Sequence, residues 1–394
     1  MKSLGIYIHI PFCIRKCEYC DFLSFSADED ARARYVKGLV CEIETEAEKY
    51  RNYEVESVFI GGGTPSVLKR EELESIANAI SRNYNIARGA ENACEFTVEM
   101  NPGSGHAGFF DFLSENPLVN RVSIGLQSAN DDELKVLGRI HSYSQFLDTF
   151  ERVRMSGIDN INVDLISAVP GQSEKSFMES LERTLSLKPE HISVYSLIIE
   201  EGTPFFERYE NGTLELPDET AERSMYHNAS DLLKREGFVH YEISNFARPG
   251  YRCRHNLRYW ERGDYAGFGI GAASLVGNRR WRNTSDIDLY IRTFCARHLF
   301  NKNVPEEGSV RRDEQLLDRN ECMEEFIFLG LRKIEGISQE AFYDTFKVDI
   351  NSRYGRIIQK MISRGLLEKN GDFIRLTRRG IDISNTVMCE FIGE

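Results

Sequence analysis

Short apolar runs alternate with longer amphipathic stretches over roughly the first 240 residues of the chain. The runs have the length of buried strands. Strands are expected at Gly5–Ile10, Ser57–Ile60, Glu95–Glu99, Arg121–Ile124, Asn160–Leu165, His191–Leu197 and Val239–Ser244. Between them, apolar residues recur at i, i+3, i+4 and i+7, which is typical of amphipathic helices. Helices are expected at Asp28–Arg51, Arg70–Ser81, Ser144–Ser156 and Glu174–Leu185.

This alternation predicts the fold class of the first part of the chain. Strands that alternate with helices form a parallel sheet with right-handed crossovers. Six or so such units are fewer than the eight that close a complete barrel. We therefore predict an α/β fold, with a partial (β/α)6 barrel over residues 1–240.

The rest of the chain changes character. Residues 241–310 are rich in Gly, aromatic residues and Arg, and we expect them to form the last strands and loops over the barrel. Residues 311–394 are expected to form a mostly helical, winged-helix-like domain. Its predicted elements are helices at Ser338–Phe346, Asn351–Arg364 and Thr377–Phe391, and a hairpin of Leu366–Lys369 and Phe373–Leu376. We expect this domain to be a lid or a partner surface.

Composition excludes several classes of function. The chain has 49 Lys and Arg against 62 Asp and Glu, a net charge of −13, which argues against general nucleic-acid binding. Its apolar runs are shorter than the roughly 18–20 residues of a membrane span, so any membrane contact should be peripheral. The nine cysteines are an odd number without a disulfide pattern or a signal peptide, so we expect a reducing, cytoplasmic location.

Three of the cysteines lie close together: Cys13, Cys17 and Cys20, with the spacing C-x3-C-x2-C. A structural zinc ion takes four protein ligands, so three thiolates suit a site that is one ligand short. A [4Fe–4S] cluster has four irons, and three cysteines leave one iron open to another ligand. The plain alternative is that these are reduced core cysteines, but three on one loop beside Arg15 and Lys16 favour the cluster.

Polar and glycine residues follow the predicted strands in turn. The carboxyl ends of parallel strands meet at one face, where ligands bind. There the second strand is followed by Gly61-Gly62-Gly63-Thr64-Pro65, and later strands by Glu99, by Gln127 with Arg139, and by Asp164. Glycines allow close backbone approach, and the charged groups suit ammonium, carboxylate or hydroxyl ligands. Singly, each could be a tight turn or a solvated side chain.

These residues together resemble the coproporphyrinogen-oxidase-like branch of the radical S-adenosylmethionine (SAM) superfamily, over nearly the whole chain. The runs that carry the resemblance are Tyr7 to Cys13, Phe59 to Ser66, Val98 to Gly103, Ser123 to Ser128, Leu137 to His141, and Asp164-Leu165. The resemblance implies that Cys13, Cys17 and Cys20 hold a [4Fe–4S] cluster. It also implies that SAM is surrounded by Tyr7, Tyr19, Gly62, Gly63, Thr64, Glu99, Gln127, Arg139 and Asp164, with a backbone contact from Ala273 near the adenine. It assigns no catalytic side chain.

A second candidate site lies in the run from Cys253 to Trp260. Cys and His both ligate haem iron, although a histidine among aromatic residues is more often a packed, hydrogen-bonded one. His255-Asn256 with Tyr259-Trp260 resembles the HNxxYW motif of the haem chaperones in this family. That resemblance implies haem as a third cofactor, His255 as its candidate ligand, and haem-receiving proteins, membrane-bound ones included, as partners.

Two enzymatic branches of the family compete with the chaperone. The oxygen-independent coproporphyrinogen III oxidase has a further cysteine two residues after the third, where this chain has Phe22, and a longer arm before the cluster than the twelve residues before Cys13. A radical SAM haem methyltransferase shares the cluster loop, but the Tyr259-Trp260 run favours the chaperone. We therefore expect haem binding without coproporphyrinogen oxidase activity, with SAM as a ligand or a substrate.

Overall fold

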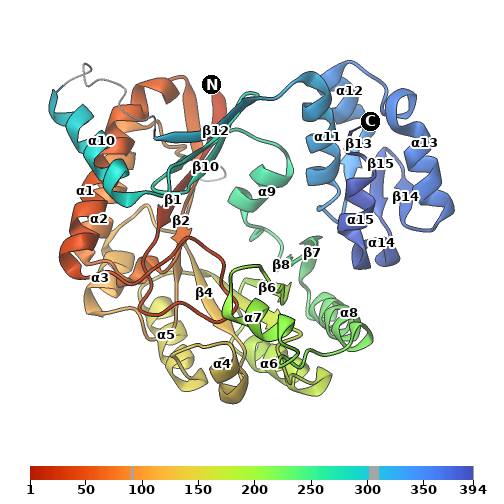
Figure 1. The fold of residues 1–394 in the computed structure, drawn as a ribbon, viewed down its shortest axis with the longest axis horizontal. Helices are drawn as coiled ribbons and strands as arrows, with labels where there is room; N and C mark the ends of the chain where they lie inside the picture. The colour runs from red at the N-terminus through yellow and green to blue at the C-terminus, as the bar shows by residue number, and fades with distance from the viewer. Residues whose placement is uncertain (90–92, 301–309, 394) are drawn as a thin grey trace.

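The computed structural model describes residues 1–89, 93–300 and 310–393. Its centre is a parallel sheet whose first six strands lie side by side in chain order (Figure 1). These strands are β1 (Lys2–Ile10), β2 (Tyr53–Gly62), β3 (Glu95–Met100), β4 (Arg121–Gln127), β5 (Asn160–Ser167) and β6 (His191–Ser196). Each predicted strand is present within a few residues of its expected bounds. The α/β fold with a partial (β/α)6 barrel is therefore confirmed.

Helices cover the outer face of this sheet and return the chain between parallel strands (Figure 1). They are α1 (Glu29–Glu46), α2 (Arg70–Asn83), α3 (Ala107–Glu115), α4 (Asp131–Val136), α5 (Tyr143–Met155), α6 (Glu174–Ser186), α7 (Pro204–Glu210) and α8 (Glu219–Arg235), with 3-10 turns η1 (Ala47–Tyr50) and η2 (Pro65–Val67). The inner faces of the helices and the strands form one large apolar core, in which strand residues such as Ile6, Ile8 and Val163 are fully buried.

The extension after residue 240 widens the sheet on both sides. β7 (Val239–Glu242) and β8 (Asn245–Ala247) add antiparallel strands beside β6. On the opposite edge, β9 (Tyr265–Phe268) lies parallel to β1 and is followed outward by β10 (Ala273–Val276), β11 (Arg279–Asn283) and β12 (Arg311–Leu316). Two helices complete the extension: α9 (Arg254–Trp260) and α10 (Ile287–Phe300). The chain thus returns from one edge of the barrel to the other through α9.

The C-terminal part has its own apolar core, in which Leu317, Phe342 and Tyr354 are buried. Its elements are α11 (Arg319–Gly330), β13 (Ile337–Ser338), α12 (Gln339–Phe346), α13 (Ile350–Ser363), β14 (Leu367–Asn370), β15 (Phe373–Leu376), α14 (Arg378–Asp382) and α15 (Ser384–Cys389). Three helices followed by a hairpin that pairs with β13 are the arrangement expected of a winged-helix-like unit.

Two details differ from the expected elements. The expected last helix, Thr377–Phe391, is broken at Ile383, whose φ of −127° and ψ of 36° lie outside the helical region. α15 places Val387 and Met388 in the second core, and Ile381 of α14 packs against that core. The strand Arg311–Leu316 pairs with β11 in the large sheet, although the domain boundary was expected at 311. Residues 301–309, at the end of the predicted extension, lie outside the described residues.

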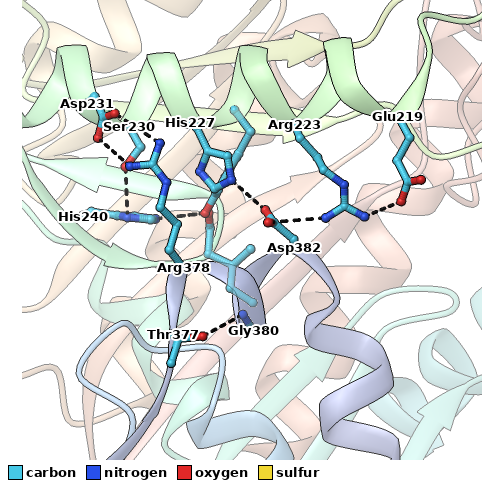
Figure 2. A network of polar contacts seen from close by, with 12 residues as sticks. Glu219, Arg223, His227, Ser230, Asp231, His240, Thr377, Arg378, Gly380 and Asp382 are labelled. Carbon is cyan, nitrogen blue, oxygen red and sulfur yellow. Dashed lines mark hydrogen bonds and ion pairs between the residues drawn. The ribbon is translucent and has the colours of Figure 1, made fainter. Parts of the chain in front are cut away.

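The C-terminal domain contacts the barrel at several places. Backbone hydrogen bonds join Ile243 to Arg332 and Ile334 to Tyr241. On another side, Asp382 of α14 accepts from His227 and Arg223 of α8, at 2.8 and 3.4 Å (Figure 2). Ion pairs near the surface contribute about 0–1 kcal/mol each. These contacts therefore determine the orientation of the C-terminal domain on the barrel more than they raise the free energy of unfolding.

Candidate functional site

A cavity opens at the carboxyl ends of the parallel strands, where the sequence predicts the site. It is called here the cysteine cavity. It brings together residues that lie on or just after five successive strands, β1 to β5. Those that were predicted from the sequence are Cys13, Cys17, Tyr19, Cys20, Gly62, Gly63, Thr64, Glu99, Gln127, Arg139 and Asp164. Because these residues are spread over more than 150 positions of the chain, the parallel fold itself is what gathers them.

Polar side chains connect two of the three thiols through a continuous chain of hydrogen bonds. Thr64 Oγ1 donates to Cys13 Sγ at 3.4 Å and accepts from Asn101 Nδ2 at 2.8 Å. Asn101 Oδ1 accepts from Arg139 at 2.5 Å, and the same guanidinium donates to Cys17 Sγ at 3.5 Å. The network fixes the thiols in one orientation.

The donor set of the cysteine cavity fits an iron–sulfur cluster. Cys13, Cys17 and Cys20 are free thiols, and all three are partly exposed to the cavity. Among the described residues, no three His, Cys, Asp or Glu side chains converge closely enough to hold a single metal ion. Three thiolates that each bind a different iron of a cluster need not converge on one point. The arrangement therefore suits a cluster better than a mononuclear ion.

The glycine turn after β2 packs against the beginning of the cysteine loop. Gly63 N donates to Ile10 O at 2.8 Å, and Thr64 N donates to Phe12 O at 2.7 Å. Gly62 has a φ of +108°, and a Cβ there would lie 2.4 Å from Nδ1 of His9. A side chain at Gly62 is thus excluded both by the backbone and by space. The turn and the cysteine loop form one rigid wall.

Two buried carboxyl groups line one side of the cysteine cavity. Glu99 accepts from Gly62 N at 3.1 Å, and burial, reinforced by the charge of Asp164, raises the pKa of Glu99 to about 8. Burial also raises the pKa of Asp164, which accepts from Asn162 at 2.8 Å and from Ser123 at 3.2 Å. A buried acidic pair is costly without a partner. This side of the cavity therefore suits a ligand with positive charge or hydroxyl groups.

The raised pKa of Glu99 has a measurable consequence for stability. Between pH 4.5 and about 8 the folded chain holds a proton on Glu99 that the unfolded chain has released, so the free energy of unfolding falls as pH rises. Glu99→Gln cannot titrate. Relative to this variant, the wild type should lose up to about 1.4 kcal/mol per pH unit across that window. Urea unfolding of the cluster-free protein at several pH values measures the difference.

A matched control for this experiment is Glu71→Gln, because Glu71 is an exposed residue of α2. Its free energy of unfolding should follow the wild type in parallel across the same pH range. Parallel profiles for Glu99→Gln as well would contradict the expected protonation of the buried carboxyl.

A second cavity, of about 340 Å³, continues from the first into the barrel and is called here the barrel cavity. The two share Tyr19, Cys20, Phe22, Glu99, Ser123, Gln127 and Asp164. The barrel cavity has apolar walls that include Phe59 and Ile166, and its mouth is lined by Phe22 and Ile198, which are 62% and 64% exposed. The shared residues make the two cavities one continuous space.

A buried arginine lines the barrel cavity from the amino end of β4. Arg121 is only 2% exposed, and among the described residues its Nε finds no hydrogen-bond partner. One of its terminal nitrogens donates a long hydrogen bond to Thr97 Oγ1, at 3.5 Å. An unpaired donor on a buried cation is unusual. Arg121 therefore offers an unused hydrogen bond to an anionic group that enters the cavity.

His255 does not line either cavity. Its ring is 1% exposed, with Nδ1 hydrogen-bonded to Ser57 at 2.9 Å and Nε2 to Tyr259 at 2.8 Å. The ring stacks on Phe59, 5.3 Å between centroids, and burial lowers the pKa of His255 to about 3. Iron could reach this imidazole only if one of the two hydrogen bonds broke. The next residue, Asn256, does line the barrel cavity.

The helix α9 that carries this motif also contacts the C-terminal domain. The guanidinium of Arg332 lies 4.3 Å from the ring centroid of Trp260, and Arg262, just after the helix, forms an ion pair of 2.9 Å with the buried Glu325. α9 thus lies between the wall of the barrel cavity and α11. In this structure the helix that carries the motif is packed between the barrel and the C-terminal domain and connects the two.

Two further predicted residues lie apart from the cavities. Tyr7 is on β1, behind the glycine turn, where its hydroxyl is 3.1 Å from Nδ1 of His9. Ala273 begins β10 and pairs with Arg282, outside the residues that line either cavity. Conversely, sequence reasoning gave no role to Asn101 or Arg121. Asn101 lies in the run that follows Glu99, so its position was visible, whereas a charged residue at the start of a strand looks like a solvated one.

Comparisons with known proteins agree with this site and fold. Residues 7–184 match the radical SAM superfamily, and residues 317–383 match the HemN C-terminal domain. The chain is 36% identical to the heme chaperone HemW of Lactococcus lactis, over 99% of this chain and 98% of that protein. It is 35% identical to HemW of Bacillus subtilis over the full length of both, and 32% identical to HemW of Escherichia coli over 100% and 99%.

Among solved structures, the coproporphyrinogen III oxidase HemN of Escherichia coli is similar in fold, with a TM-score of 0.83 at 20% identity, covering 100% of this chain and 90% of that one. The fold and the cysteine cavity define a radical SAM protein of the HemN-like type. Within that class, the chain belongs to the HemW family. The radical SAM match ends within α6, so it includes the part of the barrel-cavity lining from Tyr19 to Ile166, and α9 lies outside it.

Proposed function

We propose that the protein is a haem chaperone: it binds a [4Fe–4S] cluster, SAM and haem, and passes haem to haem-dependent proteins. The observation that carries the proposal is the continuity of the two cavities. A three-thiol site with room for a fourth ligand opens directly into a second cavity, whose walls include Phe22, Phe59 and Ile198. The relatives that match over their full length carry the name heme chaperone. Among the described residues, no helix is both long and apolar enough to cross a bilayer.

Cys13, Cys17 and Cys20 would hold the cluster, which supplies an open iron to which SAM can bind. SAM would occupy the rest of the cysteine cavity. There Glu99 and the glycine turn can accept and donate hydrogen bonds to its amino acid part. Arg139 has five N–H donors, and those that Cys17, Asn101 and Gly125 leave over can face the carboxylate.

Haem would occupy the barrel cavity. Phe22, Phe59 and Ile198 offer apolar surface to a flat macrocycle, and the unpaired Nε of Arg121 offers a donor to a propionate. The described residues that line this cavity include no histidine but two phenols, Tyr19 and Tyr195, and phenolate is a haem ligand in other proteins. His255 would affect haem binding indirectly, because its ring stacks on Phe59 in the wall of the barrel cavity.

The test is anaerobic cluster reconstitution, haem titration and a coproporphyrinogen assay on the same preparation. We expect roughly one haem per chain, and no conversion of coproporphyrinogen with SAM under reducing conditions. Robust conversion would instead assign the chain to the oxidase branch, whose member HemN shares the fold. New methylated haem products would point to the methyltransferase alternative.

The site of haem binding is tested by two variants. Ile198→Asp places a charge at the mouth of the barrel cavity, and haem affinity should fall at least about tenfold, since desolvating a carboxylate costs more than 1.4 kcal/mol. His255→Ala should keep the haem spectrum but lose about 2–4 kcal/mol of unfolding free energy, because Ser57 and Tyr259 lose their partner. Haem titration and urea unfolding measure both.

Ile392→Asp is the matched control, because Ile392 is an exposed apolar residue of the C-terminal domain, at 54% exposure. Its haem affinity should equal that of the wild type. A haem spectrum that disappears in His255→Ala, in a variant that still folds, would return the ligand to His255.

A further inference from the structure

A chain of hydrogen bonds runs from the barrel cavity into the interior of the protein. Asn162 Nδ2 donates to Asp164 Oδ1 at 2.8 Å, and Asn162 Oδ1 lies 2.6 Å from Nδ1 of His191. On the other side of this ring, Nε2 lies 2.7 Å from the hydroxyl oxygen of Tyr241. The described residues that line the cavities include Asn162 and Asp164 but neither His191 nor Tyr241, which are 0% and 4% exposed. These two residues therefore reach the site through Asn162.

A backbone donor at the inner end fixes the direction of these hydrogen bonds. The N–H of Cys253 donates to the Tyr241 hydroxyl at 3.3 Å, and among the described residues the other partner of that hydroxyl is Nε2 of His191. The hydroxyl hydrogen is therefore donated to Nε2. Because burial lowers the pKa of His191 well below its usual value, the ring is neutral and carries its one hydrogen on Nδ1. Nδ1 then donates to Asn162 Oδ1, and the amide hydrogens of Asn162 face Asp164.

This direction suits an ionised Asp164. Its carboxylate accepts from Asn162 and from Ser123, while Ser193 donates to the Asn162 oxygen at 3.1 Å. If the histidine hydrogen moved to Nε2, the Asn162 amide would turn over and point its oxygen at Asp164. Two facing oxygens require a hydrogen between them, so Asp164 would then bind a proton. The tautomer of His191 thus decides how readily Asp164 is protonated.

Charged and titratable groups on the neighbouring strands also act on Asp164. Burial raises the pKa of Asp164, and its hydrogen bonds and the guanidinium of Arg121 on β4 oppose that rise. Glu99 on β3 and the phenol of Tyr195 on β6 interact with the same carboxyl group. Substitutions at His191 leave all of these groups in place, so comparison with the wild type isolates the effect of the ring.

We propose that His191 is a positioning residue, which orients Asn162 so that Asp164 stays ionised and accepts hydrogen bonds from the hydroxyl groups of SAM. The inference rests on the proposed function, in which SAM occupies the cysteine cavity that Asp164 lines. Hydrogen bonds to an ionised acceptor are about twice as strong as neutral ones. SAM affinity should therefore fall wherever Asp164 becomes protonated, which is on the acid side of its pH profile.

The first test observes the tautomer without SAM. Nitrogen NMR of the full chain with isotope-labelled histidine distinguishes the Nδ1–H form from the Nε2–H form, and the signal of His191 is the one missing in His191→Asn. We expect the Nδ1–H form in the wild type. Tyr241→Phe removes the donor to Nε2, so this variant should show a mixture of both forms. The Nε2–H form in the wild type would overturn the proposal whether or not SAM binds.

The second test is calorimetry of SAM on the reconstituted full chain, from about pH 5 to about pH 9. In His191→Leu, the fall in affinity on the acid side should begin about one pH unit higher than in the wild type, an up to tenfold loss in that interval. His191→Asn keeps a donor near the position of Nδ1, although its side chain is smaller, and should follow the wild type. Tyr241→Phe should shift the profile in the same direction as His191→Leu, and replaces it if the leucine variant does not fold.

His240→Leu is the matched control, because His240 is another hydrogen-bonded histidine of the sheet, on β7, two strands away from β5. Its profile should follow the wild type. An unshifted profile in His191→Leu, or an equal shift in His191→Asn or His240→Leu, would overturn the proposal, since a packing role would affect the smaller asparagine at least as much.

Asp164→Asn separates this proposal from the SAM site on which it rests. This variant cannot ionise, and its SAM affinity should fall about tenfold at neutral pH. Wild-type affinity in Asp164→Asn would overturn the proposed SAM site and the role of His191 together. Weakened binding in Asp164→Asn beside an unshifted His191→Leu would overturn the role of His191 alone.

Discussion

Cys17→Ser is expected to leave the reconstituted protein without most of its iron and acid-labile sulfide. Only two thiolates would remain for a cluster that needs three, and a serine hydroxyl is a poor iron ligand. The substitution also removes the sulfur that accepts from Arg139 at 3.5 Å, so the hydrogen-bond chain from Arg139 to Cys13 loses one end. Iron and sulfide analysis and the visible absorption spectrum measure the loss. Cys13→Ser and Cys20→Ser should behave alike.

Two cysteines outside the loop serve as controls. Cys94 is buried in the barrel core and Cys389 is exposed at the end of α15. Their serine variants should keep the iron and sulfide of the wild type after reconstitution. Unchanged iron in Cys17→Ser, or an equal loss in Cys389→Ser, would contradict the assignment of the cluster to the loop.

Gly62→Ala is expected to disrupt the site through the backbone. At a φ of +108° a side chain costs about 1–3 kcal/mol of strain. The added methyl would lie 2.4 Å from the His9 ring, which cannot move easily because its two nitrogens bond Tyr7 and Leu23 O. Overpacking adds about 1–3 kcal/mol, so the free energy of unfolding should fall by about 2–6 kcal/mol. Urea unfolding measures it, and calorimetry should show weaker SAM binding.

Gly355→Ala is the matched control for this substitution. Gly355 lies inside α13, where the nearest atom to an added Cβ is Asn351 Cβ at 3.7 Å. Because alanine is the better helix former, this variant should be neutral or up to about 1 kcal/mol more stable. Equal stability of Gly62→Ala and the wild type would show that the glycine turn is more adaptable than its contacts indicate.

The fold could largely be predicted from the sequence because its strands are short, buried and apolar. β3 was expected at Glu95–Glu99 and runs over Glu95–Met100, and β5 differs from its expected bounds by two residues at one end. The parallel pairing of β9 with β1 was not expected. Tyr265–Phe268 is a four-residue run without alternation, and its partner lies more than 250 positions earlier. The local pattern of apolar and polar residues does not predict a contact between segments so far apart in the chain.

The site was predictable to the extent that it follows from strand order. Glu99, Gln127 and Asp164 were placed by their positions after successive strands, and the fold brings them to one cavity. The role of His255 could not be judged in this way, because a sequence motif does not show whether its histidine is buried. Arg121 was not found because its neighbours in the barrel, not in the chain, leave its Nε unpaired. What the sequence lacks in both cases is the environment of the side chain.

The position of α9 limits what mutagenesis of its motif can reveal. The seven residues of α9 position a wall of the barrel cavity, because His255 stacks on Phe59. They also support the C-terminal domain, because Trp260 contacts Arg332. A substitution at either end therefore changes two things at once. Loss of haem transfer in such a variant is therefore not evidence that the substituted residue is an iron ligand. Only a spectrum of the bound haem, recorded with a separate measure of domain packing, distinguishes a lost ligand from a displaced domain.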